Sequence, residues 1–179
     1  MQKAYQHYEN GKAFPYWAKL WPSAFVLTEF IKDNLDLIRN KKVLELAAGL
    51  GLPSLFSSHF ASSVLCSDYD HFAIEFIKEN IALNNIGNMA SEMINWTKLP
   101  PQLDSEVLLL SDINYNPKDY DILLNLMRFF LAKGNTILLS TPQRLAAKPF
   151  ITALLPWCIR NEEWWHDHVA INVLVLKSL

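Results

Sequence analysis

The fold is decided by the stretch Lys42-Val43-Leu44-Glu45-Leu46-Ala47-Ala48-Gly49-Leu50-Gly51-Leu52-Pro53-Ser54. Its apolar beginning is too short for a helix, and a glycine-bearing turn follows at once, so the pattern predicts a buried strand, a turn and the start of a helix. In an open α/β sheet, ligands with an adenosine end bind at this strand-to-helix turn. Gly49 and Gly51 are expected to let the backbone approach such a ligand, because glycine has no Cβ.

The turn departs from the dinucleotide-binding pattern G-x-G-x-x-G, because Ser54 stands at the third glycine position. Pro53 removes a backbone N–H from the start of the helix, where a pyrophosphate needs donors. Glu45 ends the strand and is expected to place a carboxylate near the ligand. This charge disfavours a phosphate and favours a ligand that carries an ammonium and a sulfonium. A nicotinamide-dependent dehydrogenase is therefore the least favoured interpretation.

The spacing Glu45-x-Ala47-x-Gly49-x-Gly51 resembles the E/D-x-G-x-G-x-G motif of seven-strand S-adenosylmethionine-dependent methyltransferases. Ala47 replaces the first glycine, which is a mild departure because alanine is the smallest residue with a Cβ. The resemblance extends over residues 15–176 and implies S-adenosylmethionine as the cofactor. It also implies a Rossmann-like, doubly wound α/β fold whose seven-stranded sheet is mostly parallel with a C-terminal antiparallel strand.

The rest of the chain alternates helix and strand signals in the order that such a fold requires. Helical signals begin at Pro22, cover residues 52–60, follow Asp70, and begin again at Asn116 and Pro117. Strand signals cover residues 63–67, 91–94, 107–110 and 136–140. The tail, residues 158–179, offers two further β-rich runs that fit a terminal antiparallel pair.

Composition narrows the function. The chain has 179 residues, of which 51% are hydrophobic and 19% charged, and this indicates one globular domain over residues 1–179, which the resemblance implies is a methyltransferase domain. The net charge of −2 argues against a nucleic-acid partner. Cys66 and Cys158 are isolated and predict no metal site. The first residues lack an apolar signal segment, and no run is long enough to cross a bilayer. We therefore expect a cytoplasmic monomer that has no membrane partner.

Two carboxylates near the end of the second predicted strand are candidates for a ribose. Asp68 lies 19 residues after Gly49 (68 − 49), close to the spacing at which an acid meets ribose hydroxyls. Asp70 opens a helix and is favoured as its N-cap. We therefore assign the ribose to Asp68 and expect Tyr69 beside the adenine.

Aromatic residues are expected at both ends of the ligand. In the resembled family an acid or amide and an aromatic residue contact the adenine, which implies this role for Asn95 and Trp96; the alternative for Trp96 is a surface position. Trp17 and Trp21 belong to an aromatic segment, residues 15–22, that could anchor the first helix or cover the ligand. This segment resembles the aromatic-Trp-Pro segment of lysine methyltransferases, which implies that Trp21 lines the methionine end of the cofactor.

Asp112 and Tyr115 follow the fourth predicted strand and share a rim with the glycine-bearing turn if the sheet is doubly wound. Their spacing resembles the D-x-x-Y motif of a lysine methyltransferase group, which implies that both are catalytic and that Asp112 also contacts the cofactor. Methyltransferases of nucleic-acid amino groups use D/N-P-P-Y/F here, but Ile113 and Asn114 replace both prolines. Taken alone, Asp112 could instead cap a turn while Tyr115 packs on the sheet edge.

Together these features favour an S-adenosylmethionine-dependent N-methyltransferase that acts on a protein lysine amine. Such an amine has a pKa near 10.4 and must lose a proton before it accepts a methyl group. Asp112 and Tyr115 are expected to position it, while low-polarity surroundings favour its neutral form. A small-molecule amine N-methyltransferase and a non-catalytic S-adenosylmethionine-binding scaffold remain the alternatives.

Overall fold

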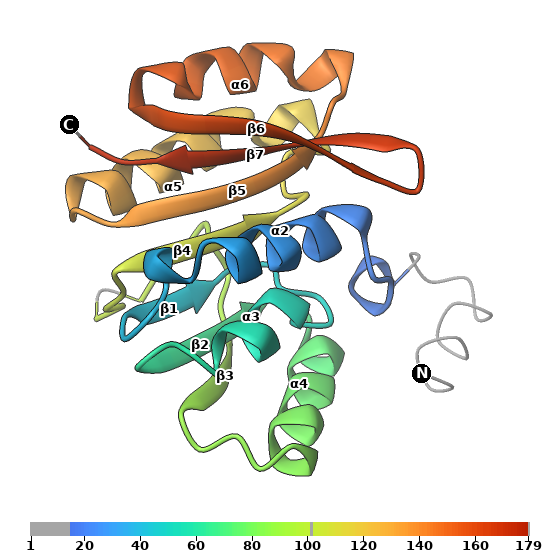
Figure 1. Ribbon diagram of the computed structural model, residues 1–179, viewed down its shortest axis with the longest axis vertical. Helices are drawn as coiled ribbons and strands as arrows, with labels where there is room; N and C mark the ends of the chain where they lie inside the picture. Colours follow the sequence, from blue (N-terminus) through green and yellow to red (C-terminus); the bar gives the residue numbers. More distant parts are fainter. Residues whose placement is uncertain (1–14, 101, 179) are drawn as a thin grey trace.

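The computed structural model describes residues 15–100 and 102–178 (Figure 1). Its strands are β1 (Lys42–Glu45), β2 (Ser63–Asp68), β3 (Met89–Met93), β4 (Val107–Ser111), β5 (Thr136–Pro142), β6 (Cys158–His166) and β7 (Val169–Leu176). They form one sheet in the order β3-β2-β1-β4-β5-β7-β6. Neighbours from β3 to β5 are parallel, and β7 is antiparallel to both β5 and β6. The predicted seven-stranded, mostly parallel α/β fold with an antiparallel C-terminal strand is confirmed.

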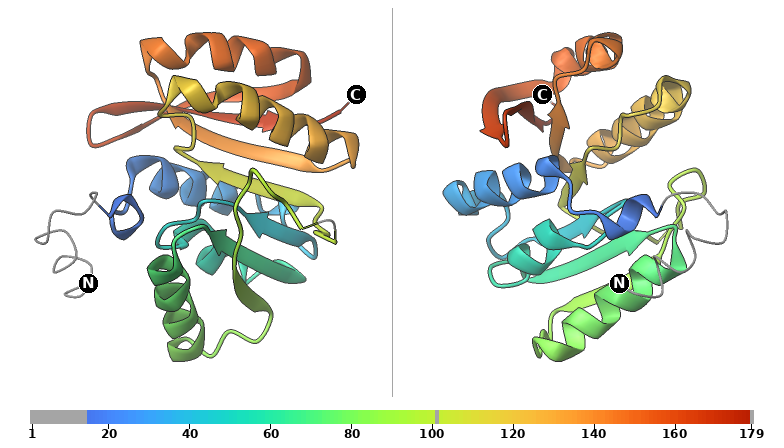
Figure 2. Two further views of the ribbon diagram at one scale, coloured as in Figure 1. Left: turned by 180° about the vertical axis from the view of Figure 1, so that it is seen from behind. Right: turned by 90° about the vertical axis from the view of Figure 1, so that its right-hand side faces the viewer.

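Helices cover both faces of this sheet. The α-helices are α2 (Pro22–Asp33), α3 (Leu52–Ser57), α4 (His71–Leu83), α5 (Tyr120–Ala132) and α6 (Lys148–Leu154). The 3-10 turns are η1 (Tyr16–Ala18), η2 (Leu35–Leu37), η3 (Pro117–Asp119), η4 (Leu145–Ala147) and η5 (Leu155–Trp157). Buried residues of α2 and α4 belong to one apolar core, and those of α5 and α6 belong to another. Figure 2 shows α2 and α3 on one side of the sheet and α5 on the other.

The central strand β4 explains why the sequence is apolar at consecutive positions. Val107 and Leu109 point into the core beneath α2, whereas Leu108 and Leu110 point into the core beneath α5. All four side chains are fully buried, because successive residues of a strand face opposite sides and both sides are covered.

Several element ends differ from the sequence prediction by one to three residues, and the differences at α3 and β3 have a clear physical reason. Helix α3 ends at Ser57 rather than at residue 60, because the following turn carries the Phe60 carbonyl back to accept a hydrogen bond from the Asn40 N–H at 2.9 Å. Strand β3 begins at Met89, because pairing with Val64 of β2 extends the ladder two residues before Ser91. The expectation that the first residues lack an apolar signal segment concerns residues 1–14, which lie outside the described residues.

The strand ends matter for the site. The parallel strands β1, β2, β3, β4 and β5 all finish at the same edge of the sheet, so the residues that follow them are gathered along one rim. No helix among the described residues is long and apolar enough to span a bilayer.

Candidate functional site

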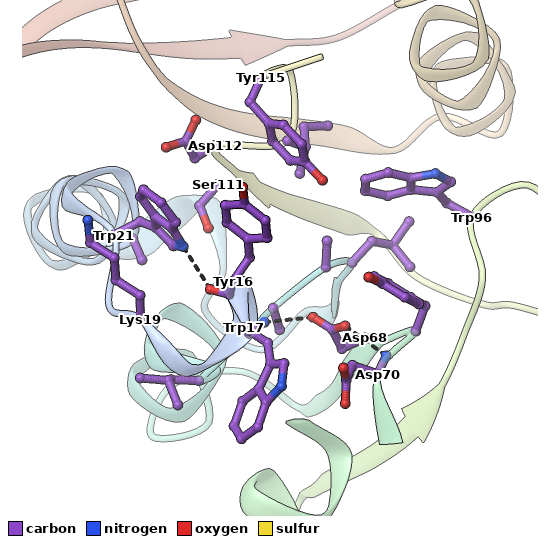
Figure 3. Close-up of a pocket in the computed structure, with 18 of the residues that line it drawn as sticks. Tyr16, Trp17, Lys19, Trp21, Asp68, Asp70, Trp96, Ser111, Asp112 and Tyr115 are labelled. Atoms are coloured by element: carbon purple, nitrogen blue, oxygen red, sulfur yellow. Dashed lines mark hydrogen bonds between the residues drawn. The ribbon is translucent and has the colours of Figure 1, made fainter. Parts of the chain in front are cut away.

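A pocket of about 970 Å³ opens along this rim (Figure 3). Its wall combines the turn after β1 with the segments that follow β2, β3, β4 and β5, and η1 and the start of α2 close it from the N-terminal side. The predicted site residues that line it are Trp21, Ala47, Gly49, Asp68, Tyr69, Asn95, Trp96, Asp112 and Tyr115. Glu45 and Gly51 are not part of the lining.

A Cβ at either glycine of the turn would meet other atoms of the protein. Both have left-handed backbones, with φ of 55° at Gly49 and 72° at Gly51. A Cβ on Gly51 would lie 3.0 Å from the Cys66 Sγ and 3.4 Å from Ile77, and one on Gly49 would lie 3.1 Å from the Trp17 carbonyl oxygen. Gly49 lines the pocket, so close approach of a ligand to its backbone stays a prediction, whereas Gly51 lies outside the lining and is constrained by packing against β2 and α4.

Ala47 has the left-handed backbone of the glycine that it replaces. Its φ is 54°, a region where the Cβ of an L-residue crowds the following carbonyl. This conformation costs an alanine roughly 1 kcal/mol or more. The substitution is thus less neutral than residue size alone predicts.

Glu45 lies behind the turn and is fully buried. One carboxyl oxygen, Oε2, accepts hydrogen bonds from the N–H and the hydroxyl of Ser54, while Oε1 has no hydrogen-bond partner in the described part of the chain. Burial raises the pKa of this carboxyl from 4.5 to about 8, although the Ser54 hydrogen bonds act in the opposite direction. At neutral pH Glu45 is therefore mostly protonated. The expectation that Glu45 places a carboxylate charge beside the ligand is therefore wrong. The Glu45 side chain is buried outside the pocket lining, and its hydrogen bonds to Ser54 fix the start of α3.

Asp68 and Asp70 have different surroundings: Asp70 caps a helix, and Asp68 lines the pocket. The Asp70 carboxylate accepts a hydrogen bond from the Phe72 N–H at 2.8 Å, which confirms it as the N-cap of α4. Asp68 lines the pocket and is 5% exposed. Its Oδ2 accepts from the Gly49 N–H at 2.9 Å and its Oδ1 from the Asp70 N–H at 3.0 Å. Each oxygen has a second lone pair, so the carboxylate can still accept ligand hydroxyls.

Tyr69, Asn95 and Trp96 line the pocket where the chain leaves β2 and β3. Tyr69 is 73% exposed, whereas Trp96 is half-buried and packs against the core beneath α5. The Asn95 Oδ1 accepts hydrogen bonds from the N–H and the hydroxyl of Thr97, which turns the chain after β3. The Asn95 amide nitrogen remains a possible donor toward a ligand.

The aromatic segment 15–22 both anchors the chain and lines the pocket. The Trp21 indole N–H donates to the Tyr16 carbonyl at 3.0 Å, and the Trp17 ring packs against Phe76 of α4 with centroids 6.4 Å apart. The Tyr16 ring is stacked between those of Trp21 and Tyr115, at centroid distances of 6.2 and 6.3 Å (Figure 3). The segment therefore connects the glycine-bearing side of the pocket with the loop after β4.

The loop after β4 holds the two expected catalytic residues. Asp112 is buried, has a φ of 53°, and forms a two-pronged ion pair with Arg144, in which Nη1 lies 2.6 Å from Oδ1 and Nη2 lies 3.1 Å from Oδ2. Tyr115 is 59% exposed, and partial burial raises the pKa of its phenol. Its hydroxyl therefore stays protonated at neutral pH and can donate a hydrogen bond.

Three residues of this site were not predicted. Arg144 lies two residues beyond β5, and a basic residue after a strand that ends at the rim is the signal that could have found it. Asn114 is fully buried, and its Oδ1 accepts from the Thr141 hydroxyl at 2.7 Å, which ties the loop after β4 to β5. Tyr16 belongs to the aromatic segment already recognised as a possible cover. No group of three or more metal-binding side chains occurs in residues 15–100 and 102–178.

Solved structures with the same fold include methyltransferases at low sequence identity. TrmN from Thermus thermophilus superposes with a TM-score of 0.71 at 18% identity, over 90% of this chain and 53% of that one. Magnesium protoporphyrin IX methyltransferase from Synechocystis, solved with bound SAM, gives 0.68 at 13% identity, over 87% and 78%. These similarities concern the fold alone.

Sequence comparison is more specific. The electron transfer flavoprotein beta subunit lysine methyltransferase of Xenopus laevis is 31% identical over 149 residues, which cover 79% of this chain and 59% of that protein. A histone-arginine methyltransferase of Homo sapiens is 27% identical over 146 residues, or 76% and 75% of the two chains. The chain spans between about half and three quarters of the length of such relatives. Because the sequence profile of the lysine methyltransferase family matches residues 6–156, the chain belongs to that family.

Proposed function

We propose that the protein is an S-adenosylmethionine-dependent N-methyltransferase that acts on a protein lysine amine. The observation that carries this proposal is the continuity of the pocket, which joins the glycine-bearing turn and Asp68 at one end to Asp112 and Tyr115 at the other. A methyl donor and an acceptor amine need such a shared, partly enclosed space, because alignment of the two reactants supplies much of the rate. Membership of the lysine methyltransferase family supports the choice of acceptor.

The residues present fit the cofactor. Asp68 is a buried carboxylate with acceptor capacity left over, which suits the two hydroxyls of a ribose. Trp96 and Tyr69 offer ring faces for the adenine, with the Asn95 amide as a possible donor, and Trp21 stands toward the methionine end. When bound, S-adenosylmethionine supplies a methyl group on a sulfonium.

The chain's own residues would act mainly by binding, orienting and excluding water. The aromatic rings of Tyr16, Trp21 and Tyr115 give the acceptor end a low-polarity wall, which disfavours the charged form of an amine. The phenol oxygen of Tyr115 and the carboxylate of Asp112 can each accept an amine N–H, which leaves the nitrogen lone pair free to form the new N–C bond as the S–C bond breaks. On this basis we assign to Asp112 and Tyr115 the role of positioning the acceptor amine. The proton that the amine must lose leaves to water.

The test is transfer of tritiated methyl groups from S-adenosylmethionine into a cell lysate, followed by separation into acid-precipitable and soluble fractions. We expect label in precipitable protein and, after acid hydrolysis, in methyl-lysine. Asp112→Ala and Tyr115→Phe should reduce the label about a hundredfold or more. Label confined to the soluble fraction would point to a small amine, and bound cofactor without any label would point to a scaffold.

The same assay should also test arginine as the acceptor, because several relatives are named for arginine methylation. Methyl-arginine in the hydrolysate, in place of methyl-lysine, would assign the protein to that chemistry. We further propose that the enzyme is a cytoplasmic monomer without a nucleic-acid or membrane partner, and the net charge of −2 supports the part of this proposal that concerns nucleic acid. Sedimentation at micromolar concentration would test the monomer.

A further inference from the structure

The ion pair between Arg144 and Asp112 sits at the acceptor end of the pocket, and both residues line it. The Asp112 side chain is 7% exposed and that of Arg144 is 34% exposed. Both carboxylate oxygens receive a guanidinium N–H, so the pair has the two-pronged geometry that fixes orientation as well as charge. A carboxylate that is this buried and this fully engaged does not act as an isolated negative charge.

Both members of the pair are held by neighbouring backbone. The Asp112 N–H donates to the Ser140 carbonyl of β5 at 2.9 Å, and the Arg144 carbonyl accepts from the Ala147 N–H at 2.9 Å. The Tyr120 hydroxyl donates to the Ala146 carbonyl at 3.1 Å, which fastens the segment after Arg144 to α5. The pair therefore links the loop after β4 to the loop after β5 in a fixed arrangement.

The pairing decides the charge that an entering amine meets. An unpaired carboxylate near an amine stabilises the ammonium form and raises the amine pKa by about one to three units, whereas the nitrogen must be neutral to accept a methyl group. A guanidinium stays charged at every relevant pH. With Arg144 in place, Asp112 keeps free lone pairs for an amine N–H, but the pair as a whole carries no net charge.

Other ionisable groups around the pocket are placed differently. The Lys19 ammonium lies 4.2 Å from the Trp21 ring centroid, and the Asp68 and Asp70 carboxylates accept hydrogen bonds from backbone N–H groups. The remaining titratable side chains of the lining are Tyr16, Tyr69, His71 and Tyr115. Arg144 is the group that hydrogen-bonds the Asp112 carboxylate directly.

We propose that Arg144 is a positioning residue for methyl transfer, because it aims the Asp112 carboxylate at the acceptor and cancels the charge that would keep the acceptor amine protonated. This inference rests on the proposed function and adds a residue to it. The inference also implies that the acceptor is an amine that is uncharged when it lies next to the Arg144–Asp112 pair.

The test uses two ligands of nearly the same shape. Sinefungin carries an amine-bearing carbon where S-adenosylmethionine has its methylated sulfonium, and S-adenosylhomocysteine has an uncharged sulfur there. We expect Arg144→Gln, which exposes the Asp112 charge, to tighten sinefungin relative to S-adenosylhomocysteine about tenfold or more in calorimetry at pH 7.5, since a nearby opposite charge is worth one or more pKa units.

Further variants of Asp112 and Arg144 form a double-mutant cycle with Arg144→Gln. Asp112→Asn leaves the guanidinium alone and should weaken sinefungin relative to S-adenosylhomocysteine about tenfold, and the double variant should return the ratio to the wild-type value. Arg144→Lys keeps the positive charge and should leave the ratio close to that of wild type. The matched control is Arg160→Gln, because Arg160 pairs with Glu162 on β6 and does not line the pocket.

A ratio that stays unchanged in Arg144→Gln while S-adenosylhomocysteine still binds would overturn the inference and leave the proposed function intact. Equal loss of both ligands in that variant would also overturn it, since Arg144 would then serve the cofactor or the fold. If Arg144→Gln does not fold, the Asp112→Asn arm decides by the same ratio. Wild-type protein that binds neither ligand would refute the proposed function itself.

Discussion

The buried carboxyl of Glu45 makes stability depend on pH in a direction that can be measured. Glu45→Gln removes the titrating proton but keeps the size of the side chain. The amide carbonyl can still accept from the N–H and the hydroxyl of Ser54, and the amide nitrogen takes the place of the unpartnered Oε1. The variant should therefore fold, and its stability should lack the pH response that Glu45 adds.

The magnitude follows from the raised pKa. Burial raises the pKa of Glu45 from 4.5 to about 8 in the folded protein, so the native state binds this proton more tightly than the unfolded chain does. The resulting stabilisation is fully present below pH 4.5 and is lost as pH rises through 8. Each pKa unit corresponds to about 1.4 kcal/mol, so wild type should lose roughly 2 to 3 kcal/mol from this group between about pH 6 and pH 9.

The assay is urea unfolding of the ligand-free protein, monitored by tryptophan fluorescence at several pH values between 6 and 9. We expect the free energy of unfolding of Glu45→Gln to gain about 2 to 3 kcal/mol relative to wild type across this range. Glu92→Gln, an exposed change on β3, serves as the control and should follow wild type. Parallel curves for wild type and Glu45→Gln would show that the carboxyl titrates normally and that its burial is misjudged.

Three further substitutions test the turn and the cap by unfolding. Ala47→Gly should raise the free energy of unfolding by about 1 kcal/mol, because glycine accepts the left-handed backbone without strain; a loss would contradict this. Gly51→Val should lower it by about 3 kcal/mol or more, since its Cβ meets the Cys66 Sγ and Ile77. Asp70→Ala should lower it by about 1 kcal/mol as a lost helix cap, and an unchanged midpoint would refute that role.

The sequence predicted the parts of the molecule that local rules control. Apolar runs bounded by turns located the strands, and their carboxyl ends placed Asp68 and Asp112 on one rim. Contacts between distant segments were beyond these rules. The Gly51 packing depends on Cys66 of β2, and the Arg144 contact with Asp112 depends on β4 and β5 being neighbours in register.

The protonation state of Glu45 could not be predicted from the sequence either. A glutamate at the end of a strand looks like a charged ligand contact when only its position is known. In the structure Glu45 points beneath the turn toward Ser54, and burial then decides its protonation. Glu45 and Asp68 are both acidic residues at strand ends, but only the Asp68 side chain lines the pocket. The direction of the side chain, which the sequence does not show, therefore decides which of the two can contact a ligand.

Calorimetric titration with S-adenosylhomocysteine tests whether this pocket holds the cofactor through Asp68. We expect one molecule per chain at micromolar affinity, on the order of −8 kcal/mol. Asp68→Ala should weaken binding by about 2 kcal/mol or more, since the ribose hydroxyls lose a charged acceptor, whereas Asp70→Ala should bind as wild type does. Binding of NADH without binding of S-adenosylhomocysteine would show that the pocket does not hold this cofactor, and equal affinity in Asp68→Ala and wild type would show that Asp68 does not bind the ribose.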